Sequence, residues 1–281
     1  MDRADQEQRV LKIRRISHAI EDEVVRRYSS AARRILFLDY DGTLVPFSKV
    51  PEAAVPEERV LSQLRRLSAD TRNTLVIVSG RKREFLDQWF GALPVHLIAE
   101  HGAFLRTLPG GWTQQADTDP AWKQRFLPVL RRYVDRCVGA FIEEKAFSLV
   151  WHYRNADREI ALLRSRELED ELRDRVSHES GLQVMEGHKI IEVKQSGYDK
   201  GSVAVQLLGS GPFDFVLAVG DDKTDEDLFR ALPAHALTFK IGMGVSLARY
   251  NLEDQKEVSR LIDRMLAGTP GSVRPLDRPT V

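Results

Sequence analysis

Short apolar runs alternate with segments of helical spacing along most of this chain, and this alternation determines the expected fold class. Five runs have the length of a buried strand: residues 35–38, 75–78, 97–99, 215–219 and 237–241. Buried strands that are connected by crossover helices form a parallel sheet covered on both faces. The sequence therefore predicts an α/β protein built on a parallel-sheet core.

The stretch 107–194 has a different pattern and predicts a second, inserted domain. Pro109, Gly110 and Gly111 open it, and helical spacing covers about 120–136 and 157–178. A pair of strand candidates follows each helix: 140–144 with 147–153, and 182–185 with 189–194. Two such units can form one sheet with helices on a single face. We therefore expect a small α/β domain at 107–194 between core segments 31–106 and 195–268.

The two ends of the chain are predicted to lie outside these domains. Residues 1–30 contain an apolar stripe that indicates an amphipathic helix. The residues of this stripe are Ile13, Ile16, Ile20, Val24 and Tyr28. The last segment, 269–281, is rich in proline and glycine and is predicted to be a flexible tail.

Charge and cysteine content exclude several classes of partner and location. The chain has 42 basic and 42 acidic residues, so it has no net field that would attract nucleic acid or a membrane surface. Its single cysteine, Cys137, cannot form an internal disulfide, which favours a reducing compartment. The longest apolar runs are far shorter than the roughly 18 residues of a membrane span. We predict a cytoplasmic protein that binds neither nucleic acid nor membranes.

Two carboxylates follow the first predicted strand, in the motif Asp39-Tyr40-Asp41-Gly42-Thr43. In an open parallel sheet, ligands bind beyond the carboxyl ends of the strands, where both side chains would lie. Asp39 would serve as a nucleophile, and Asp41 as a general acid and then a general base. A turn in which Asp and Gly only satisfy the backbone is the alternative for so short a motif.

The other strand and helix ends carry complementary groups. Ser79, Gly80 and Arg81 follow the second run, where a hydroxyl and backbone amides suit phosphate oxygens. Ser79 as a simple helix cap is the alternative. Lys200 precedes a helical pattern, and a lysine at a helix start is unfavourable against the helix dipole unless an anion lies nearby.

Acidic residues follow the run 215–219 in the motif Gly-Asp-Asp-Lys-Thr-Asp-Glu-Asp, residues 220–227. The acids at 225–227 are explained by an ordinary helix start, since carboxylates there favour the dipole. Asp221 and Asp222 come before that start, at the strand end, where a hard cation with oxygen ligands would use them.

Electrostatics explain why these groups belong together. A carboxylate that approaches a phosphate to about 4 Å meets a repulsion of about 4 kcal/mol per pair of unit charges at an effective dielectric of 20. A Mg²⁺ ion between Asp39, Asp221 and a phosphate oxygen, with Lys200 opposite, would offset this repulsion. The sequence therefore predicts a magnesium-dependent phosphatase.

These motifs resemble those of the haloacid dehalogenase superfamily: DYDGT, the Ser of VSGR, the Lys of YDKG and the acids of GDDKTDED. Within it, LFLDYDGTL, AEHGAFLR, EEKAFSLVWHYR and GDDKTDEDLF resemble the trehalose-6-phosphate phosphatases. The resemblance covers about 33–266. It implies a Rossmann-like core, an inserted mobile cap domain, and hydrolysis of trehalose 6-phosphate through an aspartyl-phosphate. It also implies Mg²⁺ bound by Asp39, the Asp41 main-chain carbonyl and Asp221, with Asp222 close by.

The resemblance further implies sugar contacts from the cap and from the boundary between cap and core. The matching positions here are Arg81, Glu100, His101, Glu143, Lys145, Arg154, His188 and Glu192. Strand alternation puts Glu143 and Lys145 on one face, and His188 and Glu192 on one face. Residues of a solvated cap sheet are the alternative. The family commonly has Gly-Lys where this chain has Gly187-His188-Lys189, so His188 takes the place of the usual lysine.

Two alternatives in function follow. The first is a phosphatase for another sugar phosphate, such as sucrose phosphate or mannosyl-phosphoglycerate. The second is a domain that senses a sugar phosphate without catalysis, against which the presence of all the catalytic groups argues. In addition, the segment before the core resembles the junction in fusions with trehalose-6-phosphate synthase, so association with a synthase is a hypothesis.

Overall fold

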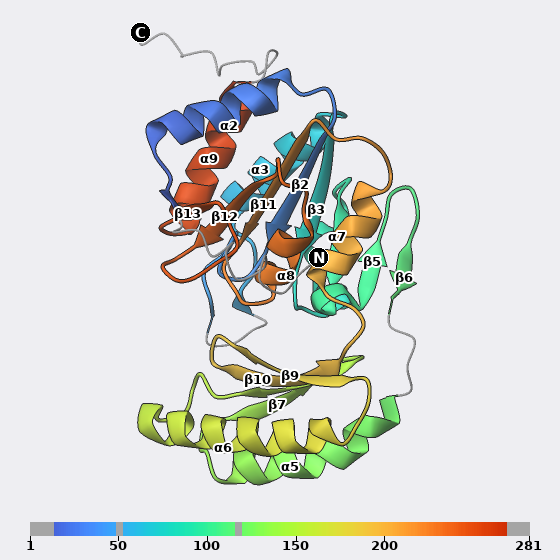
Figure 1. Ribbon diagram of the computed structural model, residues 1–281, viewed down its shortest axis with the longest axis vertical. Coiled ribbons are helices and arrows are strands. Elements are labelled where there is room, and N and C mark those ends of the chain that lie inside the picture. The colour runs from blue at the N-terminus through green and yellow to red at the C-terminus, as the bar shows by residue number, and fades with distance from the viewer. Residues whose placement is uncertain (1–13, 49–52, 116–119, 269–281) are drawn as a thin grey trace, which may run out of the picture.

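The computed structural model describes residues 14–48, 53–115 and 120–268, which form two domains (Figure 1). The core domain is a nine-stranded sheet with the order β1-β13-β12-β11-β2-β3-β4-β5-β6. Its strands are β1 Arg14–Arg15, β2 Arg34–Asp39, β3 Asn73–Val78, β4 His96–Ala99, β5 Phe104–Arg106, β6 Trp112–Gln114, β11 Phe215–Gly220, β12 Leu237–Ile241 and β13 Tyr250–Leu252. In this order, each pair of neighbouring strands between β1 and β4 is parallel. Strand β5 pairs antiparallel with β4, and β6 pairs antiparallel with β5, at one edge of the sheet. The five predicted apolar runs are all strands of the parallel part.

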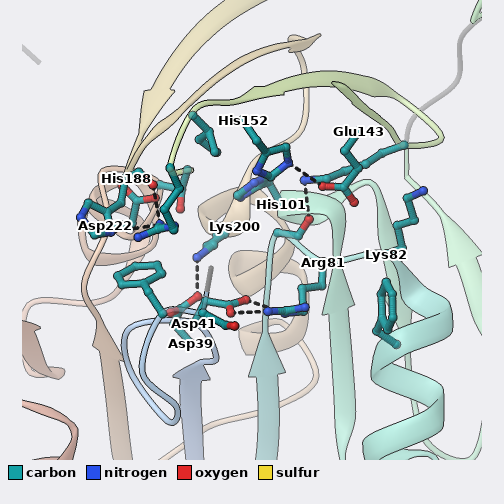
Figure 2. Close-up of a pocket in the computed structure, with 18 residues that line it drawn as sticks. Asp39, Asp41, Arg81, Lys82, His101, Glu143, His152, His188, Lys200 and Asp222 are labelled. Carbon is teal, nitrogen blue, oxygen red and sulfur yellow. Dashed lines mark hydrogen bonds and ion pairs between the residues drawn. The ribbon is translucent and has the colours of Figure 1, made fainter. Parts of the chain in front are cut away.

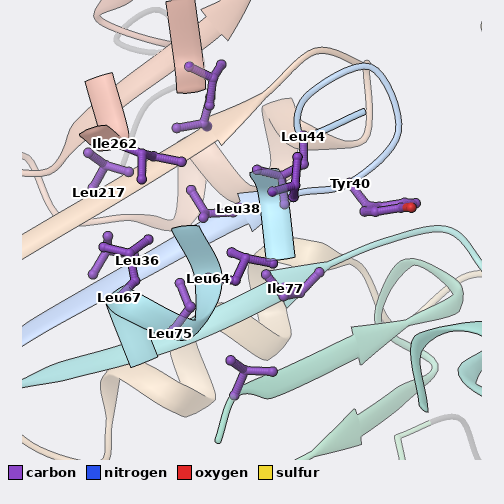
Figure 3. Packing of buried hydrophobic residues seen from close by; sticks show 14 of the residues in the cluster. Leu36, Leu38, Tyr40, Leu44, Leu64, Leu67, Leu75, Ile77, Leu217 and Ile262 are labelled. Carbon is purple, nitrogen blue, oxygen red and sulfur yellow. The ribbon is translucent and has the colours of Figure 1, made fainter. Parts of the chain in front are cut away.

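Helices cover both faces of this sheet. They are α2 His18–Ser30, α3 Glu58–Ala69, α4 Arg83–Phe90, α7 Lys200–Leu208, α8 Asp225–Ala231 and α9 Gln255–Ala267. Alternate residues of each central strand point to opposite faces. Leu36 and Leu38 pack with Leu64 and Ile262 of the α3 and α9 layer, as Figure 3 shows. Phe37, on the opposite face, packs with residues of α7 and α8. The α/β prediction is thus confirmed.

The inserted domain is a four-stranded antiparallel sheet with the order β7-β8-β10-β9. Its elements are α5 Lys123–Asp135, β7 Phe141–Glu144, β8 Ser148–His152, α6 Arg158–Ser177, β9 Leu182–Gly187 and β10 Ile190–Gln195, with short 3₁₀ turns at Pro120–Trp122 here and at Glu100–Gly102 in the core. Trp151, Ile191 and Val193 pack under α5 and α6 on one face of this sheet. The other face is turned toward the core domain (Figure 1). We call this unit the cap.

Three local expectations differ from the structure. The first helix begins at His18, because Ser17 caps it by accepting a hydrogen bond from the Ile20 amide. Ile16 therefore precedes the helix, and residues 1–13 lie outside the described residues, as does the predicted tail. Strand β6 lies in the 107–194 range expected for the inserted domain, yet it pairs with β5 in the core sheet.

The third difference concerns the hairpin of β9 and β10. Gly187 pairs directly with Ile190, so His188 and Lys189 form a two-residue turn rather than the start of a strand. Lys189 has a φ of 68° in this turn. The strand-face argument for His188 and Glu192 was therefore wrong, because side-chain alternation does not continue through a turn.

Candidate active site

The predicted motifs meet at the carboxyl ends of the central core strands, on the side of the core sheet that faces the cap. Asp39 is the last residue of β2 and pairs in register with Val78, the last residue of β3. Strand β11 pairs with β2 on the other side and ends at Gly220, directly before Asp221. Lys200 is the first residue of α7, whose amino end Asp199 caps by accepting from the Ser202 amide at 2.7 Å. Parallel strand ends and one helix start thus bring these groups together.

One lysine and two aspartates form buried ion pairs at the centre of these strand ends. The Lys200 ammonium donates to Oδ1 of Asp39 at 2.7 Å (Figure 2). It also donates to Oδ1 of Asp225 at 2.8 Å. Lys200 is 2% exposed, Asp39 4% and Asp225 0%. Burial alone would lower the pKa of Lys200, but the carboxylates of Asp225 and Asp39 outweigh it and raise that pKa. Lys200 therefore stays charged, which explains a lysine at an otherwise unfavourable helix start.

Asp225 is a site residue that sequence reasoning missed, because a helix start explained it. Its Oδ2 atom accepts hydrogen bonds from the amides of Asp221 and Asp222, both at 3.0 Å, and so shapes the turn after β11. A Cβ at Gly220 would come within 2.2 Å of the Asp225 side chain. The glycine at the strand end was thus a usable signal that the side chain five residues later folds back under the strand.

The carboxylates of Asp39, Asp221 and Asp225 form a cluster that fits a metal ion. One oxygen from each lies within 4.8 Å of the others. Oδ2 of Asp39 is buried without a hydrogen-bond partner among the residues that the structure describes. Burial and the charges of Asp225 and Asp222 raise the pKa of Asp221 to about 7. A divalent cation would satisfy the free oxygen and offset this repulsion.

Two details of the cluster concern its neighbours. Gly42 has a φ of 81°, and a Cβ there would come within 2.2 Å of Asp221, so only glycine allows this close approach. Asp222, expected close to the metal, is not part of the three-carboxylate cluster. It lines the cavity on the side of the cap turn, with Oδ2 3.4 Å from a Cβ built on Gly187.

Asp41 is held by Arg81 in a two-point ion pair. Nε and one terminal nitrogen of Arg81 donate to the two carboxylate oxygens at 2.7 and 2.6 Å (Figure 2). The guanidinium also lies 5.5 Å from the ring centre of Tyr40 and 5.1 Å from that of Trp89. Such planar pairs fix orientation as well as charge. Asp41 is therefore directed toward the strand-to-helix turn that was predicted to hold phosphate.

The turn after β3 is tightly packed. Ser79 is 1% exposed, and its hydroxyl accepts from the Arg81 amide at 3.1 Å, a contact that shapes the turn. A Cβ at Gly80 would lie 2.3 Å from the His101 ring, which allows only glycine there. His101 itself has a φ of 56°. The Gly80 and His101 pair thus forms one wall of the site.

A second buried charge group joins the cap to the core. Glu192 of β10 lies 3.7 Å from the Lys145 ammonium and 3.3 Å from Nε2 of His101. Lys145 in turn donates to the Gly80 carbonyl at 2.9 Å. Burial would raise the pKa of Glu192, but Lys145 and His101 outweigh it and lower that pKa. Glu100 lies beside this group, with Oε2 3.5 Å from the Phe147 amide. Glu192 is thus a buried partner of Lys145.

The cap turn contacts the core loop that follows the DGT motif. The ring of His188 lies 4.5 Å from the ring of Phe47, and the Arg154 guanidinium lies 5.1 Å from the same ring. Arg154 also donates to the His188 carbonyl at 2.7 Å. Burial and the charge of Arg154 lower the pKa of His188, so its ring is neutral at neutral pH.

One cavity between core and cap collects most of the predicted residues. Those that line it are Asp39, Asp41, Gly80, Arg81, His101, Glu143, Lys145, Arg154, His188, Lys200 and Asp222. Ser79, Glu100, Glu192 and Asp221 do not line it and lie behind those that do. Residues that line it without having been predicted are Phe47, Ser48, Lys82, Phe85, His152, Ile190 and Thr224.

Comparison with known proteins agrees with this geometry. A family model described as trehalose-phosphatase matches residues 37–272, which include the core motifs and the whole cap. The chain belongs to the trehalose-phosphatase family. It is 41% identical over 244 residues to a bifunctional trehalose-6-phosphate synthase/phosphatase of Thermoproteus tenax, an alignment that spans 87% of this chain and 33% of that protein. The chain thus spans about a third of the length of the curated relatives it matches.

Solved structures of the trehalose-phosphatase family share the fold. The C-terminal domain of the Candida albicans trehalose-6-phosphate phosphatase is 28% identical, with a TM-score of 0.85 over 91% of this chain and 98% of that one. A trehalose-6-phosphate phosphatase of Aspergillus fumigatus is 35% identical, with a TM-score of 0.65 over 92% of this chain and 100% of that one.

Within the described ranges of the present chain, helices that are both long and apolar enough to span a bilayer are absent.

Proposed function

We propose that this chain hydrolyses trehalose 6-phosphate to trehalose and inorganic phosphate, with Asp39 as the nucleophile and Mg²⁺ as the metal. The observation that carries the proposal is the position of Asp39. Its carboxylate lies at a strand end between the Lys200 ammonium, at 2.7 Å, and the carboxylates of Asp221 and Asp225, and it faces the cavity under the cap. A buried nucleophile with a cation on one side and a free oxygen on the other suits attack on a dianionic phosphate.

The reaction follows from the roles of the two aspartates. An Asp39 oxygen attacks phosphorus, the bond from phosphorus to the sugar oxygen breaks, and that oxygen receives a proton from Asp41. Trehalose leaves, and the phosphoryl group remains on Asp39. Asp41 then takes a proton from water, whose oxygen attacks phosphorus and releases Asp39 and phosphate. Lys200 orients Asp39. Arg81 donates to both carboxylate oxygens of Asp41 in this structure, so Asp41 would have to leave this pair to give a proton to the sugar oxygen.

The metal site of the proposal uses side chains already close together. Asp39 and Asp221 would bind the ion with the Asp41 main-chain carbonyl, and Asp225 would take the supporting position predicted for Asp222. A bound Mg²⁺ supplies positive charge that offsets the repulsion between Asp39 and the phosphate and stabilises the phosphoryl oxygens. Gly80 and its turn would hold the phosphate from the other side.

Sugar recognition is assigned to the cap side of the cavity. Glu143, Lys145, Arg154 and His188 line it with groups that accept or donate hydrogen bonds, which suits a disaccharide rich in hydroxyls. Glu192 would act indirectly, through its ion pair with Lys145.

The test is phosphate release from a panel of sugar phosphates. We expect kcat/KM for trehalose 6-phosphate to exceed that for glucose 6-phosphate by at least about a hundredfold, because losing several buried sugar hydrogen bonds costs about 3 kcal/mol or more. Sucrose phosphate and mannosyl-phosphoglycerate complete the panel. A preference for either, or equal rates on glucose 6-phosphate, would contradict the substrate while leaving the phosphatase assignment in place.

Association with a trehalose-6-phosphate synthase is a further part of the proposal. It is supported by a relative that is named as synthase and phosphatase in one chain. We also place the protein in the cytoplasm, in line with its single, buried and unpaired cysteine. Co-purification of a tagged chain with a synthase tests the association, and failure to bind or stimulate the synthase would count against it.

A further inference from the structure

His152 lines the cavity but belongs to none of the motifs that predicted the site. It is the last residue of β8, and its ring meets Glu143 of β7 on the cavity side of the cap sheet (Figure 2). Nε2 of His152 lies 2.9 Å from Oε2 of Glu143. Because a carboxylate can only accept a hydrogen bond, Nε2 must be the protonated nitrogen that donates it.

The pairing of β7 with β8 and the stacking of two rings fix this contact. Phe141 pairs in register with His152 across β7 and β8, and Glu143 is two residues further along β7 on the same face. The Phe141 and His152 rings stack with centroids 4.5 Å apart and planes 5° apart. The His152 side chain is only 13% exposed. Stacking therefore holds the imidazole in one plane while its nitrogen points at the carboxylate.

The positive charges near Glu143 explain why a hydrogen bond that orients its carboxylate matters. Lys145 and Lys82 also line the cavity, and each attracts the Glu143 carboxylate. Burial alone would raise the pKa of Glu143, but the hydrogen bond from His152 and the charge of Lys145 outweigh it and lower that pKa. Without His152, the carboxylate is free to turn toward either lysine and away from the position where a ligand hydroxyl would meet it.

We propose that His152 is a positioning residue, which holds the Glu143 carboxylate in the orientation that accepts hydrogen bonds from hydroxyls of the substrate sugar. This inference rests on the proposed function of the cap as the sugar site. His152 acts through Glu143 and lies in the cap, whereas the reacting groups Asp39 and Asp41 lie in the core. Its removal should therefore weaken binding of a sugar phosphate more than it changes the chemical step.

Two substitutions separate the parts of this role. His152→Phe keeps a ring to stack on Phe141 but removes the donor, and His152→Gln keeps a donor without the ring. For His152→Phe we expect KM for trehalose 6-phosphate to rise about tenfold, because the hydrogen bond it loses is made to a charged group. The change in kcat should be smaller, and the loss on a small aryl phosphate much smaller. His152→Gln should recover part of the binding.

His178→Phe is the matched control. His178 is exposed at the C-terminal end of α6, on the helical face of the cap, so this change should leave both substrates unaffected. Circular dichroism and thermal unfolding of each variant show whether the fold is kept.

A double-mutant cycle with Glu143→Ala decides between positioning and direct contact. If His152 acts through Glu143, the double variant should bind the sugar phosphate no worse than Glu143→Ala alone. Additive losses would overturn the proposal, because they would mean that His152 contacts the sugar phosphate independently of Glu143. A KM of His152→Phe within twofold of wild type would also overturn it. If the wild type prefers another sugar phosphate, the proposed function fails, and the same cycle on the preferred substrate still tests His152.

Discussion

Lys200→Met removes the buried cation between two carboxylates, and we expect a large loss of stability. Lys200 is 2% exposed, and its ammonium lies 2.7 Å from Asp39 and 2.8 Å from Asp225. Methionine is an unbranched, flexible chain that fills most of the same space, so the change is mainly electrostatic. Removing one partner of a buried ion pair leaves an uncompensated charge, which costs about 3–5 kcal/mol. We expect the free energy of unfolding at pH 7 without metal to fall by this amount.

The loss should depend on pH. Burial and the charge of Asp225 raise the pKa of Asp39 in the folded protein despite Lys200, and without Lys200 that pKa rises further. A carboxyl group with a higher pKa in the folded state contributes stability below its unfolded pKa, and this contribution is lost as the pH rises through the folded pKa. The free energy of unfolding of Lys200→Met should therefore be closer to wild type at pH 5 than at pH 8.

The assay is unfolding in guanidinium chloride, followed by circular dichroism at pH 5, 7 and 8 with a chelator present. Lys223→Met is the matched control, because Lys223 is exposed in the adjacent acidic loop and its loss should change stability by less than about 0.5 kcal/mol. Adding Asp225→Asn to Lys200→Met should restore part of the stability, since one of the two repelling charges is gone. A loss below about 1 kcal/mol at pH 7 would refute the reasoning.

Three further predictions concern metal and substrate. Chelation should abolish turnover, and adding Mg²⁺ should restore it. Because the pKa of Asp221 is raised to about 7, Mg²⁺ binding should release protons and should tighten from pH 6 to 8. Calorimetry in two buffers measures both effects, and an affinity that does not depend on pH would contradict this prediction. Glu143→Ala or Arg154→Ala should reduce turnover of trehalose 6-phosphate far more than that of a small aryl phosphate, whereas equal losses would place these residues in folding or chemistry. His188→Lys should change KM more than the Mg²⁺ requirement, since His188 lies in the cap turn, and the reverse order would refute that placement.

The centre of the parallel sheet could be predicted because its strands β2, β3 and β11 are largely buried on both faces. The runs at 35–38, 75–78 and 215–219 are continuous in apolar residues, and a helical segment follows each. Once the strands are parallel and adjacent, their carboxyl ends meet at one edge, so Asp39 and Asp221 had to lie close together. Order and direction of these strands were thus sufficient to place the centre of the site.

The edges of the sheet could not be predicted in this way. Strands β1, β6 and β13 contain two or three residues each, which is too short for a periodic pattern to appear. Their pairing is set by neighbours already in the sheet. For the same reason the range expected for the inserted domain included β6, which continues the core sheet instead.

The remaining site residues depend on turns and on packing between the domains. Asp225 reaches Lys200 only because the turn after Gly220 folds its side chain back. His188 faces the cavity from a two-residue turn, although the sequence was compatible with a strand there. His152 and Phe47 were overlooked because an aromatic residue in or near a strand is more often part of a core. Such contacts between distant segments leave no local pattern in a single sequence.

The central claim is that Asp39 is the nucleophile, and turnover of trehalose 6-phosphate by Asp39→Asn tests it most directly. The amide cannot attack phosphorus, and it also weakens the metal site. With Mg²⁺ present, we expect kcat to fall by at least about a thousandfold while circular dichroism shows a folded protein. Near wild-type turnover by the folded variant would contradict the account.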